Sequence, residues 1–261
     1  MRKDCLIEAD YFREYRNKFG FTNQNLLKDF LAGKDVKPLV DYSYIEEINK
    51  RLCEIIKKIN NIVSSEQKLK NMDSFCKEHI TEVYKKLKEN KILPLLNNQG
   101  RRPEQVYFSW MRGYVISNYF LKSLSEIFGV NLEEIEIIGD DDFTKLETFK
   151  RTPTADLQVN KGKEKIRIEM QAGFQGINDI KQHKVLEAKR IYERSKIVTL
   201  AIHFDIFNGQ VAFVKLNEIE DNNVNWITRQ QMEGQTVFNI DQNYFIWKLT
   251  ETPPKYEDIQ F

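Results

Sequence analysis

The chain has 261 residues, 41% of them hydrophobic and 30% charged, which suits a folded protein with a substantial core. The formal net charge is +1 at pH 7, so the chain lacks the strong overall basicity that would indicate a nucleic-acid partner. A local basic surface is still compatible with this charge. No run approaches the roughly 20 apolar residues of a membrane span, and the 3 scattered cysteines favour a reduced, cytoplasmic chain without a zinc site.

Residues 1–96 read as helical. Apolar residues recur every three to four positions from Tyr44 to Val63 and again from Leu69 to Leu87, which predicts two amphipathic helices. We expect them to pair in a helical subdomain over residues 1–96. Its role is either structural, in dimerisation, or in contact with a nucleic acid.

A turn-rich break at residues 97–100 separates this part from a second unit over residues 97–261. A long aromatic helix is predicted from Pro103 to Phe128, with proline in the first turn and Gly129 directly after the last.

The apolar period then changes from 3.6 to 2. Strands are predicted at 134–138, 154–159, 165–171, 196–204 and 210–216, with one helix at 177–192 between the third and fourth. This order predicts an α/β fold with a mixed central sheet, flanking helices and the helical N-terminal subdomain.

Two acidic side chains fall on neighbouring predicted strands. Because side chains alternate along a strand, Glu169 belongs to a polar face and Ile168 and Met170 to an apolar one. Asp156 belongs to the polar face of the preceding strand, so a hairpin would bring Asp156 and Glu169 together on one face.

A close carboxylate pair is costly unless a cation neutralises it. Mg²⁺ prefers oxygen ligands and commonly uses one or two carboxylates, and the backbone carbonyl of Met170 offers another oxygen. The pair therefore predicts a Mg²⁺ site, and such an ion can activate water against a phosphodiester.

The segments Pro153-Thr-Ala-Asp156 and Glu169-Met-Gln171 resemble the motif of the PD-(D/E)xK nuclease superfamily, type II restriction endonucleases in particular. The resemblance covers about residues 101–204. It implies a restriction-endonuclease-like core, a metal-dependent endonuclease activity on double-stranded DNA, and Asp156 and Glu169 as metal ligands.

The chain departs from that motif at two places. Proline stands three positions before Asp156, and Gln171 stands where lysine is usual. Glutamine neither carries charge nor accepts a proton as lysine does, so Gln171 would hold the attacking water by hydrogen bonds alone. Glu104 is either a third acid of the site or a favourable charge at a helix N-terminus.

Basic and polar residues near the motif are candidates for DNA contact. The helix after Glu169 is rich in Lys, Arg and Gln, as expected of a helix that faces phosphates. The candidates, for each of which an ordinary surface or loop role is the alternative, are Arg101, Arg102, Arg112, Gln175, Asn178, Lys181 and Lys184.

Three functions compete. The first is a type II restriction endonuclease that cuts a short specific sequence as a C2 homodimer, since a palindromic site needs two active sites. The second is a repair, phage or mobile-element nuclease of the same fold. The third is a DNA-binding or protein-interaction module without catalysis, in which Gln171 marks a lost activity.

Overall fold

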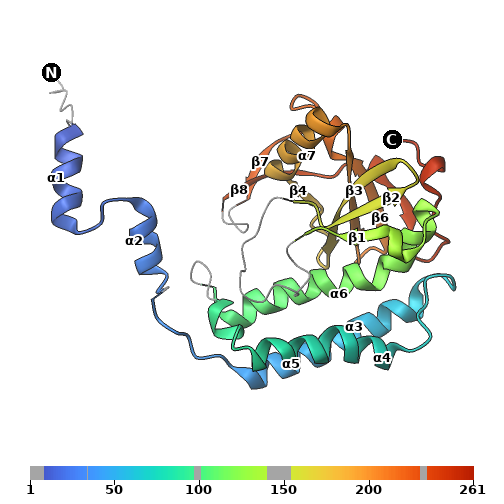
Figure 1. Ribbon diagram of the computed structural model, residues 1–261, viewed down its shortest axis with the longest axis horizontal. Helices are drawn as coiled ribbons and strands as arrows, with labels where there is room; N and C mark the ends of the chain where they lie inside the picture. The colour runs from blue at the N-terminus through green and yellow to red at the C-terminus, as the bar shows by residue number, and fades with distance from the viewer. Residues whose placement is uncertain (1–8, 34, 97–100, 140–153, 230–233) are drawn as a thin grey trace.

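The computed structural model describes residues 9–33, 35–96, 101–139, 154–229 and 234–261. Cys5, the turn at residues 97–100 and Pro153 therefore lie outside the described residues, and Cys53 and Cys76 are free thiols. Figure 1 shows the arrangement of the elements.

The N-terminal third is helical, as expected. Its α-helices are α1 (Ala9–Phe19), α2 (Gln24–Leu31), α3 (Tyr42–Ile62), α4 (Met72–Cys76) and α5 (Glu82–Glu89), with a π-helical turn (Lys77–Thr81) between the last two. The long aromatic helix follows as α6 (Pro103–Phe128), and Gly129 ends it in the left-handed conformation with φ 63°.

The remainder is mixed. In chain order it contains β1 (Ile135–Ile137), β2 (Leu157–Lys161), β3 (Glu164–Gly173), β4 (Asp179–Lys181), α7 (Gln182–Ser195), β5 (Val198–Asp205), β6 (Gln210–Lys215), β7 (Ile227–Arg229), β8 (Gln235–Asn239) and β9 (Phe245–Lys248). Short 3-10 turns lie at Leu93–Leu96, Leu132–Glu134, Leu216–Glu218, Gln242–Tyr244 and Tyr256–Asp258.

The central sheet has the order β1-β2-β3-β5-β6-β9. β3 and β5 run parallel, joined by the crossover through α7, and the other neighbouring pairs are antiparallel. A smaller sheet has the order β4-β8-β7. The predicted α/β fold, with a mixed central sheet, flanking helices and helical N-terminal region, is confirmed.

Helices cover both faces of the central sheet. α6 lies between the sheet and the layer formed by α3, α4 and α5 (Figure 1), and α7 lies on the opposite face. The larger hydrophobic cluster joins α3–α6 with the apolar side of β2, β3 and β5, through side chains such as Ile168 and Phe204. The smaller cluster lies beneath α7 and includes Ala201 and Phe238.

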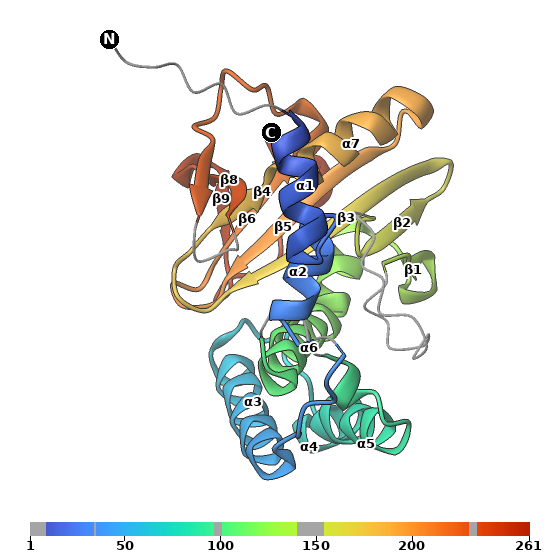
Figure 2. The same cartoon turned by 90° about the vertical axis from the view of Figure 1, so that its left-hand side faces the viewer.

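The division of the chain at residues 96 and 97 stays a prediction. The larger cluster contains residues from both sides of that boundary, among them Ile45 and Phe120. By contrast, α1 and α2 contain no buried residue and stand apart from the rest of the molecule in Figure 1. In Figure 2, which turns this side toward the viewer, they lie in front of the other elements. Among the described residues no helix is both long and apolar enough to cross a membrane.

Candidate active site

Asp156 lies where β2 begins to leave β3. The last pair of the ladder at this end joins Leu157 to Ile168, and Asp156 precedes it in a bend. Its carboxylate Oδ2 accepts a hydrogen bond of 2.7 Å from the backbone N–H of Met170. The Asp156 side chain thus supplies the hydrogen-bond acceptor that the β2 backbone no longer offers to β3 at this point.

The end of β1 holds Asp156 from the other side. The backbone N–H groups of Ile138 and Gly139 each donate to the carbonyl oxygen of Asp156 at 3.0 Å. A Cβ at Gly139 would lie 3.0 Å from the Asp156 Cα and 3.3 Å from the Ala155 oxygen. Any other residue at position 139 would force one of the two backbones to shift, so glycine suits this close approach.

Glu169 is buried beneath α7, with 6% of its surface exposed. Lys184, from the first turns of α7, donates to its Oε2 at 2.7 Å and to the backbone oxygen of Thr154 at 3.2 Å. The Lys184 ammonium therefore joins β3 to the segment that leads into Asp156, and it partly compensates a carboxylate removed from water.

The two carboxylates act on each other. Burial raises the pKa of Glu169 well above its ordinary value, and the negative charge of Asp156 raises it further. The ammonium groups of Lys184 and Lys181 act in the opposite direction but do not cancel these effects. Burial and the charge of Asp156 thus favour the neutral form of Glu169 when no cation is bound.

The expectation that Asp156 and Glu169 share one face is not met. Asp156 borders a cleft on the α6 side of the sheet, together with Leu157 and Met170. Glu169 lies on the α7 side, among Arg167 and Thr199. The physical reason is the bend before β2, which takes Asp156 out of the alternation of the strand and turns its carboxylate into the opening between β2 and β3.

The donors fit a hard divalent cation but form a sparse set. In an antiparallel pair the N–H and C=O of one residue point to the same edge, so the Met170 carbonyl is directed to the edge where Asp156 lies. Over the described ranges, no group of three or more His, Cys, Asp or Glu could hold a metal. Two carboxylates and a carbonyl, completed by water or phosphate oxygens, suit Mg²⁺.

Gln171 is half-buried and stands beside His203 in the parallel register of β3 and β5. Sequence reasoning assigned Lys184 to DNA contact, and the structure instead places its ammonium on Glu169. The α7 helix thus brings a lysine to the site although position 171 carries none. The sequence showed that this helix is basic, but it did not show that Lys184 contacts Glu169, because that contact depends on how α7 packs over β3.

The structure does not bring Glu104 to this site. Its Oε1 accepts a 2.6 Å hydrogen bond from the backbone N–H of Asp41, the N-cap of α3. It lies nine residues before Gly113 on α6, roughly 14 Å along the helix axis from the cleft beside Asp156. Glu104 therefore connects α6 to the N-terminus of α3.

The arginines near the start of α6 differ in their surroundings. Arg112 is half-buried, with its guanidinium over the Phe108 and Phe174 rings at 5.1 and 5.7 Å, and burial and the charge of Arg101 lower its pKa. Arg101 is therefore close enough to act on Arg112. Arg102 is exposed and is the N-cap residue of α6.

The remaining predicted residues lie around the ends of β3 and β4. Gln175 is exposed, and Lys181 ends β4 near Glu169. Asn178 is engaged inside the fold, where its Oδ1 lies 2.8 Å from His203 Nε2 and its Nδ2 donates to Asp205 at 3.3 Å. This buried Asn178–His203–Asp205 cluster was not predicted, because its members are separated by up to 27 residues.

No protein-family model and no curated protein matches the chain. Among solved structures, the Holliday junction resolvase Hjc of Archaeoglobus fulgidus, an archaeal hyperthermophile, aligns with 36% of this chain and 66% of its own, with 13% sequence identity and a TM-score of 0.26. The aligned part is thus slightly less than two thirds of the resolvase, and similarity at this level carries no argument about the reaction of this chain.

Proposed function

We propose that this protein is a divalent-metal-dependent endonuclease that acts on DNA, of the PD-(D/E)xK kind that its sequence motif resembles. One observation supports the proposal above the others. Two acidic side chains, Asp156 in the bend before β2 and Glu169 on β3, lie close enough that the negative charge of Asp156 raises the pKa of the buried Glu169.

Asp156, Glu169 and the Met170 carbonyl would hold the ion, for which Mg²⁺ is the best match. When bound, the ion would polarise a scissile phosphate and lower the pKa of a water. The Met170 N–H fixes Asp156 through its 2.7 Å hydrogen bond. Gln171 can orient a water by hydrogen bonds, and Lys184 provides the positive charge that Gln171 lacks.

DNA contact is proposed for the basic groups around this opening. Arg101 lies close enough to Arg112 that its charge lowers the pKa of Arg112. A phosphate between two such guanidinium groups would relieve their repulsion and accept their hydrogen bonds. Lys181 would contribute at the opposite side of the site.

The finer assignment is a type II restriction endonuclease that cuts double-stranded DNA at a short specific sequence as a homodimer. A C2 dimer would present one site to each strand of a palindrome. The exposed aromatic side chains of α1 and α2, such as Tyr15 and Phe30, offer surface for that contact. A repair, phage or mobile-element nuclease is the alternative of the same fold.

The test is digestion of a mapped plasmid with and without Mg²⁺. Discrete fragments would support the restriction enzyme, and cutting that depends on DNA structure would support the alternative. Asp156→Asn and Glu169→Gln should bind DNA and fail to cut. Glu47→Gln, which makes the same change in an exposed carboxylate of α3 that pairs with Arg51 at 3.3 Å, should cut normally. Full cleavage by Asp156→Asn or Glu169→Gln would refute the proposal.

A further inference from the structure

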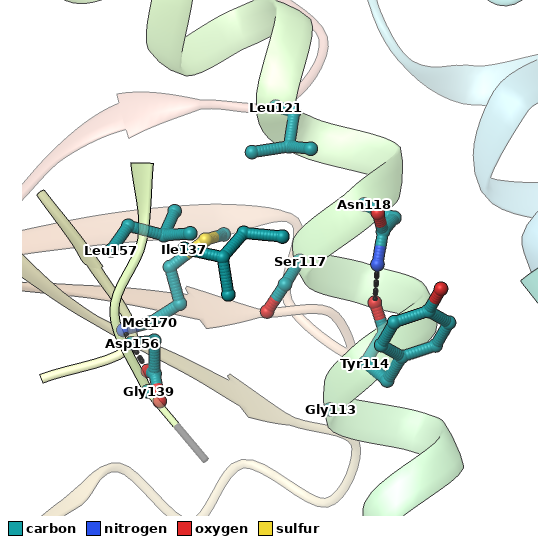
Figure 3. A pocket seen from close by; sticks show the side chains of 10 residues that line it. All are labelled: Gly113, Tyr114, Ser117, Asn118, Leu121, Ile137, Gly139, Asp156, Leu157 and Met170. Carbon is teal, nitrogen blue, oxygen red and sulfur yellow. Dashed lines mark hydrogen bonds between the residues drawn. The ribbon is translucent and has the colours of Figure 1, made fainter. Parts of the chain in front are cut away.

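A buried histidine lies beside Gln171. His203 of β5 is the register partner of Gln171 of β3, and register partners in a sheet direct their side chains to the same face. The Met170 side chain points toward α6 (Figure 3), so Glu169 and Gln171, which flank it in β3, point to the opposite face. His203 therefore borders the side chain that the proposed function places at the attacking water.

The ring of His203 leans toward β3. A Cβ added at Gly173, two positions after Gln171 and on the same face, would lie 3.3 Å from His203 Nε2 and 3.5 Å from Cε1. On the other side, the register partner of His203 in β6 is Ala212, and Phe245 meets the imidazole edge to face with 6.3 Å between the ring centroids. Of the two register partners of His203, only Gln171 has a side chain that can donate a hydrogen bond.

The hydrogen bonds around Asp205 determine which ring nitrogen of His203 carries the proton. Burial opposes the ionisation of Asp205, but hydrogen bonds from groups such as the Asn208 amide lower its pKa, so Asp205 is a carboxylate that only accepts. Asn178 Nδ2 donates to Asp205 at 3.3 Å, which leaves Asn178 Oδ1 at 2.8 Å from His203 Nε2. Because that oxygen can only accept, Nε2 carries the proton.

Nδ1 of His203 is consequently an unprotonated acceptor. Burial lowers the pKa of His203 to about 4, so near neutral pH the ring holds a single proton, on Nε2. Nδ1 is buried and has no hydrogen-bond partner among the residues that the structure describes. A buried acceptor without a donor is unfavourable and uncommon, so a donor that comes within reach of Nδ1 would be held there.

We propose that His203 is a positioning residue for Gln171: its Nδ1 accepts a hydrogen bond from Gln171 Nε2, and this contact directs Gln171 Oε1 to the attacking water. This inference rests on the proposed endonuclease function and makes it more specific. A free amide can rotate about its last bond and present either its oxygen or its nitrogen to the water. The oxygen accepts an O–H of the water and leaves the water lone pair free to attack the phosphorus, whereas the nitrogen would donate to that lone pair.

Two replacements of His203 separate the roles of its two nitrogens. The amide of asparagine lies as many bonds from the backbone as Nδ1, and the amide nitrogen of glutamine lies as many as Nε2. His203→Asn thus keeps an acceptor at Nδ1 and loses the donor to Asn178, whereas His203→Gln keeps that donor and loses the acceptor. In single-turnover cleavage at saturating Mg²⁺ and DNA, His203→Gln should be slowed roughly tenfold and His203→Asn should stay near the wild-type rate. Equal losses, or a larger loss in His203→Asn, would overturn the proposal.

A double-mutant cycle tests whether His203 acts through Gln171. Gln171→Ala should be slowed at least as much as His203→Gln, and addition of His203→Gln to Gln171→Ala should slow cleavage no further. A residue that served only the packing of the sheet would slow the Gln171→Ala protein as well, and additive losses would therefore contradict the proposal. Tyr107→Phe, which removes a buried 2.8 Å hydrogen bond to Asn49 in the helical layer, controls for lost stability and should cut at the wild-type rate.

The contact can also be observed without cleavage. In ¹⁵N NMR spectra of the metal-free full chain, the His203 signals are identified by their loss in His203→Gln, and they should show protonated Nε2 and unprotonated Nδ1. The Nδ1 resonance should shift in Gln171→Ala, because the nitrogen loses a hydrogen-bond donor. An unchanged Nδ1 resonance would overturn the positioning contact and leave the endonuclease proposal intact. Absence of Mg²⁺-dependent cleavage by the wild type would overturn the endonuclease, while the spectra would still decide whether Gln171 donates to His203.

Discussion

At the scale of single residues, the main finding is the contact between Lys184 and Glu169. The ammonium of Lys184 reaches both Glu169 and the carbonyl that leads into Asp156. It is one of the groups that lower the pKa of Glu169, whereas burial and Asp156 raise that pKa to about 8. The protonation of Glu169, and with it the binding of the proposed metal ion, therefore depends on Lys184.

Replacement of Lys184 by methionine should raise the pKa of Glu169 further, because one of its compensating charges is lost. Since Mg²⁺ must displace the proton of Glu169, the apparent Mg²⁺ affinity of the wild type should increase as the pH rises toward about 8. In Lys184→Met this increase should move to higher pH, and single-turnover cleavage should fall by roughly a hundredfold. Mg²⁺ titrations of cleavage at a series of pH values provide the measurement, and an unchanged profile would show that Lys184 does not act on Glu169.

A second prediction concerns His203, which is 3% exposed. Burial lowers its pKa from 6.5 to about 4, against the opposing charges of Asp205 and Asp179. The folded state thus holds the neutral ring, while the unfolded chain takes up a proton near pH 6.5. This contribution to stability is present above pH 6.5 and is lost as the pH falls to about 4, and its full size is roughly 3 kcal/mol.

Urea unfolding at several pH values measures this effect. The slope of the unfolding free energy between pH 4 and 6.5 should be clearly smaller in His203→Gln than in the wild type. Glutamine retains an N–H group for the Asn178 oxygen, which His203 Nε2 approaches to 2.8 Å. An equal slope in both proteins would mean that His203 is already protonated in the folded state.

At the scale of elements, the sequence predicted what local periodicity determines. α6, β3, β5 and β6 occur within a few residues of their expected bounds, since their apolar patterns are long or unbroken. The expected helix at 177–192 divides into β4 and α7, beginning at Gln182. β4 has only 3 residues and is held by β8, more than fifty residues later, and no local pattern reports such a partner.

The candidate site shows the same limit. The pairing of β2 with β3, which ends at Leu157 and Ile168 directly beside the two acids, follows from alternation and from the short connection between the strands, and it was predicted. The bend that turns Asp156 toward α6, and the arrival of Lys184 from α7, both arise from contacts between elements. The sequence could indicate these residues as candidates, but it could not indicate which of them are in contact.

Two glycines allow a matched test of these element contacts. Gly139→Ala places a methyl group 3.0 Å from the Asp156 Cα, so β1 or Asp156 must move. We expect this variant to fold but to lose much of its cleavage activity. Gly113→Ala adds the same methyl group to open space in the α6 interior, and its unfolding free energy should rise by about 0.5–1 kcal/mol. Thermal unfolding and cleavage assays of both variants give the comparison, which fails if Gly139→Ala cuts at the wild-type rate.

At the scale of the whole molecule, we expect the N-terminal arm to contribute little to the stability of the folded core. The arm comprises α1 and α2, and in it aromatic side chains contact one another, with Tyr11, Tyr15 and Phe19 in successive stacked pairs. The same rings are about half exposed, and no residue of either helix is buried. Among the described hydrophobic residues, Val40 is the first in the chain that packs against the hydrophobic cluster on the α6 side.

Removal of residues 1–37 should therefore leave the folded core intact. The truncated protein should lose the helical signal of α1 and α2, which have 11 and 8 residues, while its Tm stays within about 2 °C of the full chain. If the arm forms the proposed dimer, sedimentation equilibrium will show a dimer for the full chain and a monomer after truncation, and the cut will change from both strands to one. A Tm lowered by many degrees at a concentration where the full chain is monomeric would show that the arm packs on the core. A truncated protein that remains dimeric would place the dimer contact elsewhere on the molecule. Asp156 and Glu169 are both retained in the truncated protein, so a change in cleavage would follow from the loss of the arm and not from the loss of the site.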